Sequence, residues 1–449
     1  MQSVGEMSTL FPIQGAFIEL AGRFVDPALA FSLGVNYFYL WVSSIAHDYN
    51  NLSLTMDLWT DAVPPYAWVL IFWVAFQCTS LLGIVTYGDM EVYLSSWKML
   101  CILGGFFVAI LLNTGAIGGE YIGFRYWNTP GAFANGINGF GKSFVLAAVY
   151  FSGTEMVALT AAESRNPGKD LPKAIRHTFW RVLITFCGLV FFAGIIVPYN
   201  DGRLLTATSK SAQSPWGVAL GQAGWEGGSN LVNVVMITSH FSSINSAIYV
   251  ASRVLVALAS KGRAPAFFAR TTANGIPVNA IVFSNLFGFI ALLNSAATPA
   301  QVYRYFINIS DGAAFITWAF IGITHLRLRR AWALQGHSPD ELPHRAFLYP
   351  YGAWFVVVLN LFLVFISGYE AFIGGFSAGD FVVSYLVILI FLILYFGWKY
   401  FKGTKFISLA EADLVTGRLD LLARLKEDGA SDRRVGRPWY VVVKRFMFG

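Results

Sequence analysis

Six ionisable side chains lie inside long apolar stretches of the sequence: His47, Asp48, Lys98, Glu155, His240 and Asp311. A charge at the centre of a membrane-spanning helix costs about 2.5–3.5 kcal/mol on insertion scales. Each such residue is either part of a buried structural pair or part of a polar pathway. As a group, the six indicate a polar pathway, because a sealed structural bundle avoids that cost.

The sharpest local feature is Phe151-Ser152-Gly153-Thr154-Glu155, midway along one apolar stretch. Small residues and a hydroxyl weaken a helix, and an interrupted helix frees backbone N–H and C=O groups at membrane depth. The N–H end suits the carboxylate of an amino acid, and the C=O end suits its ammonium group. Ser152, Gly153, Thr154 and Glu155 are therefore our candidate substrate-binding residues. The alternative is a Gly-Thr packing notch between helices.

These residues need elements that cross a membrane, and the composition supplies them. Hydrophobic residues make up 56% of the 449 residues and charged residues only 12%, against about 25% charged in an ordinary soluble domain. A soluble fold cannot hide so much apolar surface behind so few charges. The same figures exclude disordered, coiled-coil, collagen-like and small disulfide-rich proteins. The sequence predicts an all-α, polytopic membrane protein.

Ten apolar runs are long enough to cross the roughly 30 Å hydrocarbon core. Residues 1–10 are typical of the end of a further helix, and 11–28 of a re-entrant or interfacial segment. We expect a transmembrane domain over 1–402 and a tail over 403–449. The predicted spans are 29–58, 66–87, 94–115, 143–162, 178–198, 229–259, 277–297, 301–326, 348–370 and 380–401.

Lys and Arg predict the orientation, because they collect on the cytoplasmic side of a membrane. With Arg23 inside and alternating spans, the basic loops near 166–178, 261–270 and 327–345 are all cytoplasmic, as is the basic tail. The C-terminus is therefore predicted to be cytoplasmic. This placement explains the basic pI of about 9.1 without a nucleic-acid partner, and it makes the lipid bilayer the expected partner.

Catalytic and cofactor motifs are nearly absent. Residues 136–143 fit the phosphate-loop pattern G-x-x-x-x-G-K-S, but that motif needs a preceding strand and an aqueous helix. Here it joins a predicted outer loop to a membrane span. No metal-ligand spacing, nucleophile elbow, haem or flavin fingerprint is visible. We expect neither an enzyme nor a bound metal or cofactor.

Several separate blocks of sequence resemble the fungal amino-acid permeases, a branch of the amino acid–polyamine–organocation transporters. The likeness runs from about Gly5 to the C-terminus. The blocks are 119–127 with 130–133, 151–155, 162–167, 197–201, 245–249, 340–343, 413–418 and 438–440.

The resemblance implies a twelve-helix carrier with two inverted five-helix repeats and two further C-terminal helices. Its first and sixth helices are broken at mid-membrane and hold the substrate, and the sixth-helix break maps onto Ser152, Gly153 and Thr154. Asp48 occupies the acidic position of the third helix. Lys98 matches a fifth-helix lysine that takes the place of a sodium ion in proton-coupled relatives. The resemblance thus gives Lys98 and Asp48 roles in proton coupling and gating.

The sequence also departs from this pattern. The first helix and most of the second are missing from it, which indicates an unrecognised upstream start or a shortened form. The third helix is unusually polar around His47–Asn51, and Ile244 replaces a common glycine.

The favoured interpretation is a plasma-membrane amino-acid symporter driven by the proton gradient through alternating access. The alternatives are a non-transporting amino-acid sensor or regulator, and a truncated inactive permease.

Overall fold

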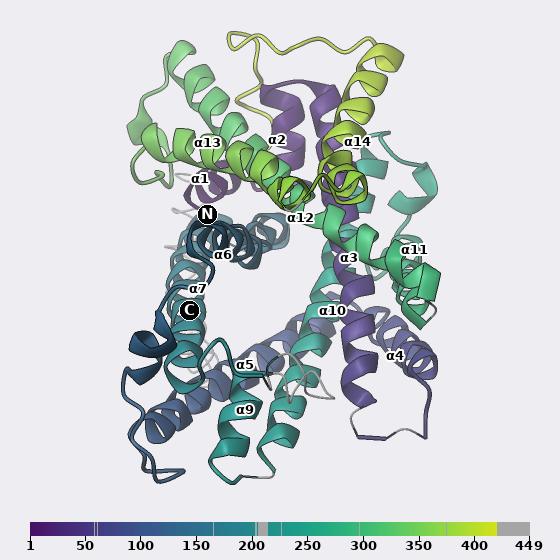
Figure 1. Ribbon diagram of the computed structural model, residues 1–449. Helices are drawn as coiled ribbons and strands as arrows, with labels where there is room; N and C mark the ends of the chain where they lie inside the picture. Colours follow the sequence, from purple (N-terminus) through teal and green to yellow (C-terminus); the bar gives the residue numbers. More distant parts are fainter. Residues whose placement is uncertain are drawn as a thin grey trace, which may run out of the picture. The chain divides into compact units, whose positions relative to one another are not determined.

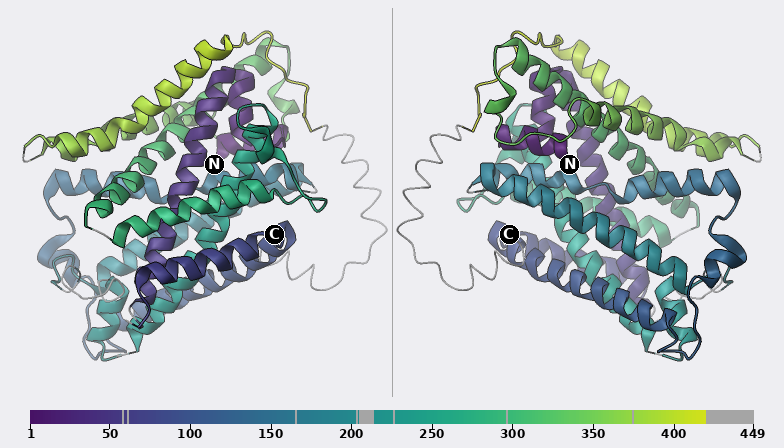
Figure 2. Two further views of the ribbon diagram at one scale, coloured as in Figure 1. Left: turned by 90° about the vertical axis from the view of Figure 1, so that its right-hand side faces the viewer. Right: turned by 90° about the vertical axis from the view of Figure 1, so that its left-hand side faces the viewer.

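The fold is built from helices alone in the part of the chain that the structure describes (Figures 1 and 2). A computed structural model describes residues 1–57, 59–60, 62–164, 166–202, 204, 214–225, 227–295, 297–373 and 375–419. The predicted all-α, polytopic fold is confirmed. Arg165 of one predicted basic loop and the tail from residue 420 lie outside the described residues.

Every predicted span corresponds to one helix or to two consecutive ones. In chain order the α-helices are α1 (Gln2–Leu10), α2 (Ala16–Phe24), α3 (Pro27–Met56), α4 (Pro65–Ser80), α5 (Ile84–Asn113), α6 (Gly136–Tyr150), α7 (Pro167–Ile196), α9 (Pro215–Gln222), α10 (Gly228–Ser260), α11 (Val278–Leu286), α12 (Ala297–Leu334), α13 (Tyr351–Ile366) and α14 (Ala378–Lys402). Short 3-10 or π turns are η1 (Trp127–Gly131), η2 (Thr154–Glu163), η3 (Ala266–Ala269), η4 (Phe287–Ser295), η5 (Pro339–Glu341) and η6 (Tyr369–Phe372).

Six of the described helices are long and apolar enough to cross a membrane: α3, α5, α7, α10, α12 and α14. Two shorter apolar segments, Val278–Leu293 and Tyr351–Ile366, correspond to further predicted spans. Helix α12 runs to Leu334, eight residues beyond the predicted end at 326, because the arginines at 327, 329 and 330 end the apolar run without ending the helix.

The predicted boundary between the second and third spans was wrong. The run 66–87 covers the end of α4, a turn and the start of α5, which begins at Ile84. Hydropathy cannot detect this turn because its flanks are apolar. Gly83 makes the turn possible, since its φ of +98° lies in the region that side chains disfavour.

The phosphate-loop pattern at 136–143 also has a structural explanation. All eight residues belong to helix α6, and no strand precedes them among the described residues. A phosphate loop wraps its backbone N–H groups around the ligand. Here the backbone N–H groups are part of a helix, so the arrangement that holds a nucleotide is not formed.

The chain divides into two compact units. Unit 1 contains Met1–Tyr37, Phe151–Arg181 and the chain from Asp311 onward, and unit 2 contains Phe38–Tyr150 and Val182–Ser310. In unit 2, α10 packs against α4, α5, α9 and α11. Its core includes Ile45 and Tyr49 of α3 and Ile244 of α10, all with 0% exposure. Ile244, where a glycine was expected, therefore fills this core.

Unit 1 contains α1, α2 and η2, which pack against one another. The described residues after α14 return along this unit, as Figure 1 shows beside α2. The backbone N–H of Ile407 donates to Val25 O at 2.9 Å, and that of Leu419 donates to Leu10 O at 2.9 Å. We call residues 403–419 the return segment.

An aspartate at the start of α3 fixes the base of the return segment. Asp26 is fully buried and forms an ion pair with Lys399 of α14. It also accepts hydrogen bonds from the hydroxyls of Tyr395 at 3.1 Å and Thr404 at 2.9 Å. The buried charge is thereby paired and hydrogen-bonded, as a carboxylate removed from water requires.

Candidate functional site

Asp48 lies on α3 and faces α10. Its Oδ1 is 2.9 Å from His240 Nδ1, and its Oδ2 accepts a hydrogen bond from the Ser243 hydroxyl. Only 9% of the Asp48 side chain and 18% of the His240 side chain are exposed. The costly carboxylate identified in the sequence therefore has two partners, both on one helix.

Lys98 lies on α5 and also faces α10. Its Nζ donates to the Ser242 hydroxyl at 2.6 Å and lies 4.0 Å from Glu91 Oε1. The Ser242 hydroxyl in turn approaches Glu91, at 2.7 Å from Oε1 and 2.9 Å from Oε2. Ser242 thus bridges the ammonium group and the carboxylate, since a hydroxyl can accept one hydrogen bond and donate another.

The two clusters meet on consecutive residues of α10, because Ser242 belongs to one and Ser243 to the other. We call the whole set the α10 network: Asp48 of α3, Glu91 and Lys98 of α5, and His240, Ser242 and Ser243 of α10. The structure therefore brings Asp48 and Lys98 to one short stretch of α10.

The charges of the α10 network nearly cancel. Lys98 offsets Glu91, and Asp48 faces an imidazole that is either neutral or cationic. With a neutral His240, the formal charges of Asp48, Glu91 and Lys98 sum to minus one. Lys98 and Glu91 are 30% and 26% exposed on their side chains, so the network is not sealed from its surroundings. The network is thus a connected set of charged and hydroxyl groups on three helices.

The second candidate group lies in unit 1, where the predicted interruption is present. Helix α6 ends at Tyr150, and residues 151–153 form a turn with Gly153 at φ +90°. The chain then continues as the 3-10 helix η2. A left-handed backbone conformation favours glycine over every residue with a side chain. The helix is therefore interrupted here, as the sequence predicted.

Within this turn, Ser152, Gly153 and Thr154 are half-buried and Glu155 is buried. The Tyr37 hydroxyl donates to Glu155 Oε1 at 3.0 Å. The other oxygen, Oε2, is buried and accepts no hydrogen bond from the described residues. Glu155 therefore anchors η2 to α3 and keeps one acceptor unused. The role of the four residues in substrate binding stays a prediction.

Some residues of this site could be predicted from the sequence, and others were not predicted. Asp48 and Lys98 were predicted, and His240 was recognised only as a costly charge. Glu91 was missed, although it precedes Lys98 by two helical turns and so lies on the same face. Ser242 and Ser243 gave no signal, since serine is common in helices of every kind. No three or more His, Cys, Asp or Glu side chains of the described residues are grouped so as to hold a metal ion.

The known proteins that this chain resembles are amino-acid permeases. The family model described as "Amino acid permease" matches residues 1–410. The General amino acid permease AGP3 of Saccharomyces cerevisiae is 39% identical over 435 residues, which is 96% of this chain and 78% of that protein. The Lysine-specific permease of the same organism is 33% identical, over 95% of this chain and 72% of that protein. The Histidine permease of Saccharomyces cerevisiae is 34% identical, over 95% of this chain and 74% of that protein.

Proposed function

We propose that this chain, which belongs to the amino acid permease family, carries amino acids across the plasma membrane together with protons. Transport of amino acids is what the family and its named relatives have in common. Proton coupling, alternating access, the plasma membrane and a cytoplasmic C-terminus are our additions. The single observation that supports proton coupling is the α10 network.

The network suits proton coupling because it places a proton-accepting pair beside a fixed ion pair. The charges of Lys98 and Glu91 cancel, so the negative charge of Asp48 is left. A proton bound by Asp48 and His240 neutralises that charge. Ser242 and Ser243 are consecutive, so a change at either cluster acts on the same turn of α10. One proton moving inward releases about 2.3 kcal/mol per 100 mV of membrane potential. That energy can accumulate a neutral amino acid.

The turn at 151–153 suits the binding and release of substrate. We propose that Ser152, Gly153 and Thr154 contact the amino and carboxylate groups, and that Glu155 holds η2 in place. Alternating access needs an element that changes its direction without unfolding its neighbours. The left-handed Gly153 between α6 and η2 is such a point.

The test is uptake of a panel of labelled neutral and basic amino acids by cells that lack their own permeases. We expect uptake that is abolished when a protonophore collapses the gradient. Lys98→Met and Asp48→Asn should each lower it at least tenfold at equal surface amount. His47→Gln is the matched control, because His47 precedes Asp48 on α3 but pairs with Asn51 at 2.8 Å, outside the network.

Three outcomes separate the alternatives. Uptake that survives the protonophore contradicts proton coupling and leaves amino-acid transport standing. No uptake of any amino acid from correctly delivered protein contradicts transport by this chain. In that case an amino-acid-dependent signal in the same cells identifies a sensor, and its absence identifies an inactive permease.

A further inference from the structure

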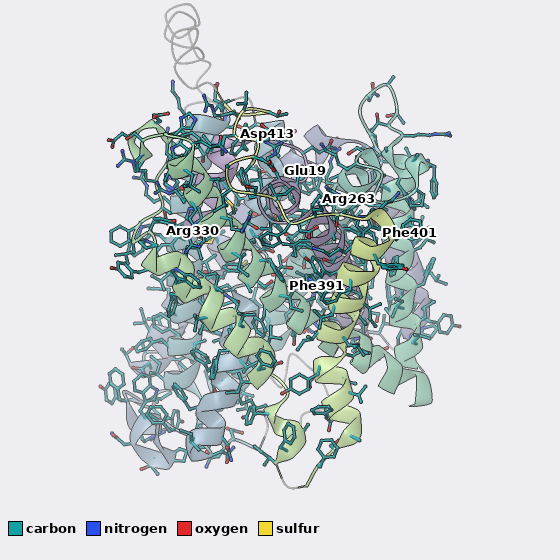
Figure 3. All side chains as sticks on the ribbon, turned by 90° about the horizontal axis from the view of Figure 1, so that it is seen from above. Glu19, Arg263, Arg330, Phe391, Phe401 and Asp413 are labelled. Carbon is teal, nitrogen blue, oxygen red and sulfur yellow. The ribbon has the colours of Figure 1, made fainter. Side chains whose placement is uncertain are left out.

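A basic cleft lies at the end of α12 in unit 1, next to the return segment. Its volume is about 630 Å³, and it is lined by the last turns of α12 and by the loop that leads to α13. Figure 3 labels Arg330 in this region. The polar lining includes Arg329, Arg330, His337 and Arg345, and the aromatic lining includes Trp332 and Tyr349.

The walls of the cleft are held in place by internal contacts. Trp332 stacks on His337 with ring centroids 4.4 Å apart, and its indole N–H donates to Ser338 O at 2.9 Å. His337 Nδ1 lies 2.9 Å from Glu341 Oε2. The Ser338 side chain and the Glu341 carboxylate close both halves of a capping box at η5. The cleft is therefore formed before any ligand arrives.

Three acidic residues pair with basic residues of the cleft. This pairing determines which positive charge has no acidic partner. Glu6 lies 2.7 Å from Arg329 Nε, Asp340 pairs with Arg345, and Glu341 contacts His337. Arg330 lines the same cleft, is exposed, and has no hydrogen bond or ion pair within the described residues. One uncompensated guanidinium, with five N–H donors, thus faces the cleft.

Beside this charge the chain exposes apolar side chains. Phe347 is 75% exposed and Leu348 is 60% exposed. Leu348 has φ +59°, a left-handed conformation that is costly for a branched side chain. Three residues later the apolar helix α13 begins at Tyr351, which is 78% exposed. A tyrosine at the end of an apolar helix is typical of the membrane–water boundary.

We propose that this cleft binds the head group of an anionic phospholipid. Arg330 takes the phosphate, with Arg345 next to it, while Phe347 and Leu348 contact the acyl chains. A free anion makes no contact with the exposed apolar pair. The head group of a zwitterionic lipid has a phosphate as well, but its own ammonium group offsets that charge, so the unpaired guanidinium favours a head group with a net negative charge. With the cytoplasmic orientation proposed above, the lipid belongs to the inner leaflet of the membrane, and this one point rests on the proposed function. Binding itself does not depend on the orientation.

The experiment uses the full chain, purified in a neutral detergent, with short-chain phosphatidylserine as the probe. Binding is measured by native mass spectrometry, and the thermal midpoint by fluorimetry. Phosphatidylcholine of the same chain length and inorganic phosphate are the comparison ligands. The variants are Arg330→Gln, Phe347→Ser with Leu348→Ser, and the matched control Arg270→Gln, at an exposed arginine on the loop after α10.

We expect phosphatidylserine to bind and to raise the midpoint, and phosphatidylcholine to do neither. Arg330→Gln should weaken phosphatidylserine binding about fivefold, the usual effect of one basic side chain at an anionic lipid surface. The Phe347 and Leu348 double variant should weaken it as well, and Arg270→Gln should leave it unchanged. The lipid-free midpoint of each variant must match that of the parent chain, which shows that the fold is intact.

Equal binding of the two lipids overturns the proposal, as does an equal effect of Arg330→Gln and Arg270→Gln. Stabilisation by inorganic phosphate that matches phosphatidylserine also overturns it, because the site then accepts a free anion. None of these measurements uses uptake, so failure here leaves the transport proposal untouched, and the reverse also holds.

Discussion

Replacement of Ser242 by alanine tests the α10 network at its centre. The hydroxyl accepts a hydrogen bond from Lys98 Nζ at 2.6 Å and lies 2.7 Å from Glu91 Oε1. A hydrogen bond to a charged group contributes about 1.5–3 kcal/mol. Lys98 and Glu91 keep their direct attraction at 4.0 Å, which recovers part of the loss. We therefore expect Ser242→Ala to lower the free energy of unfolding by about 2 kcal/mol.

The matched control makes the same chemical change one turn earlier on α10. The Ser239 hydroxyl donates to Val235 O at 2.7 Å, a bond to the carbonyl of its own helix. Such back-bonding adds little to stability, so Ser239→Ala should change the unfolding free energy by no more than about 0.5 kcal/mol. The assay is chemical or thermal unfolding of the purified protein in detergent. Equal effects of the two substitutions would refute the bridging role of Ser242.

Three further predictions concern single positions. Gly153→Ala should destabilise the chain by roughly 1–2 kcal/mol, because it places a Cβ on a left-handed backbone; Gly221→Ala within helix α9, where a Cβ meets nothing within 4 Å, should be neutral or stabilising in the same unfolding assay. Asp26→Asn should lower stability by about 2 kcal/mol and make the return segment more accessible to proteases, since Lys399 loses its buried partner; unchanged cleavage would contradict the anchoring role. Burial acts to raise the pKa of Asp413, but hydrogen bonds from Thr416 and Val415 lower it to about 2. A carboxylate with a lowered pKa stabilises the folded form above its usual pKa and loses that effect as the pH falls. The protection of these two amides, which is the intrinsic exchange rate divided by the measured rate at the same pH, should therefore be high above pH 4 and fall as the pH drops through about 2. Asp413→Asn should remove this pH dependence of the protection.

The positions of the membrane spans could be read from the sequence because hydropathy measures what a bilayer selects. The method failed at Gly83, where a tight turn joins two apolar helices and leaves no polar interval. The interruption at Gly153 could be predicted because its cause is local. Glycine and other small residues in an apolar run weaken the helix that contains them. Local causes are visible in a sequence.

Partners across the fold are not visible in that way. Asp48 and His240 are 192 residues apart, and Tyr37 and Glu155 are 118 apart. The cost of burying each charge could be predicted from its residue type, but the group that offsets the cost depends on helix packing. Glu91 is the exception, since its two-turn spacing from Lys98 is a signal within one helix. The domain boundary at 402 and the roles of Ser152–Glu155 stay predictions.

The central claim is that an amino acid and a proton cross the membrane together through this chain. The most direct measurement uses the purified protein in liposomes with an imposed proton gradient and a pH-sensitive dye inside. We predict that an amino acid added outside enters against its own gradient, that the lumen acidifies with it, and that Lys98→Met abolishes both. Amino-acid entry with no change of internal pH would contradict the account.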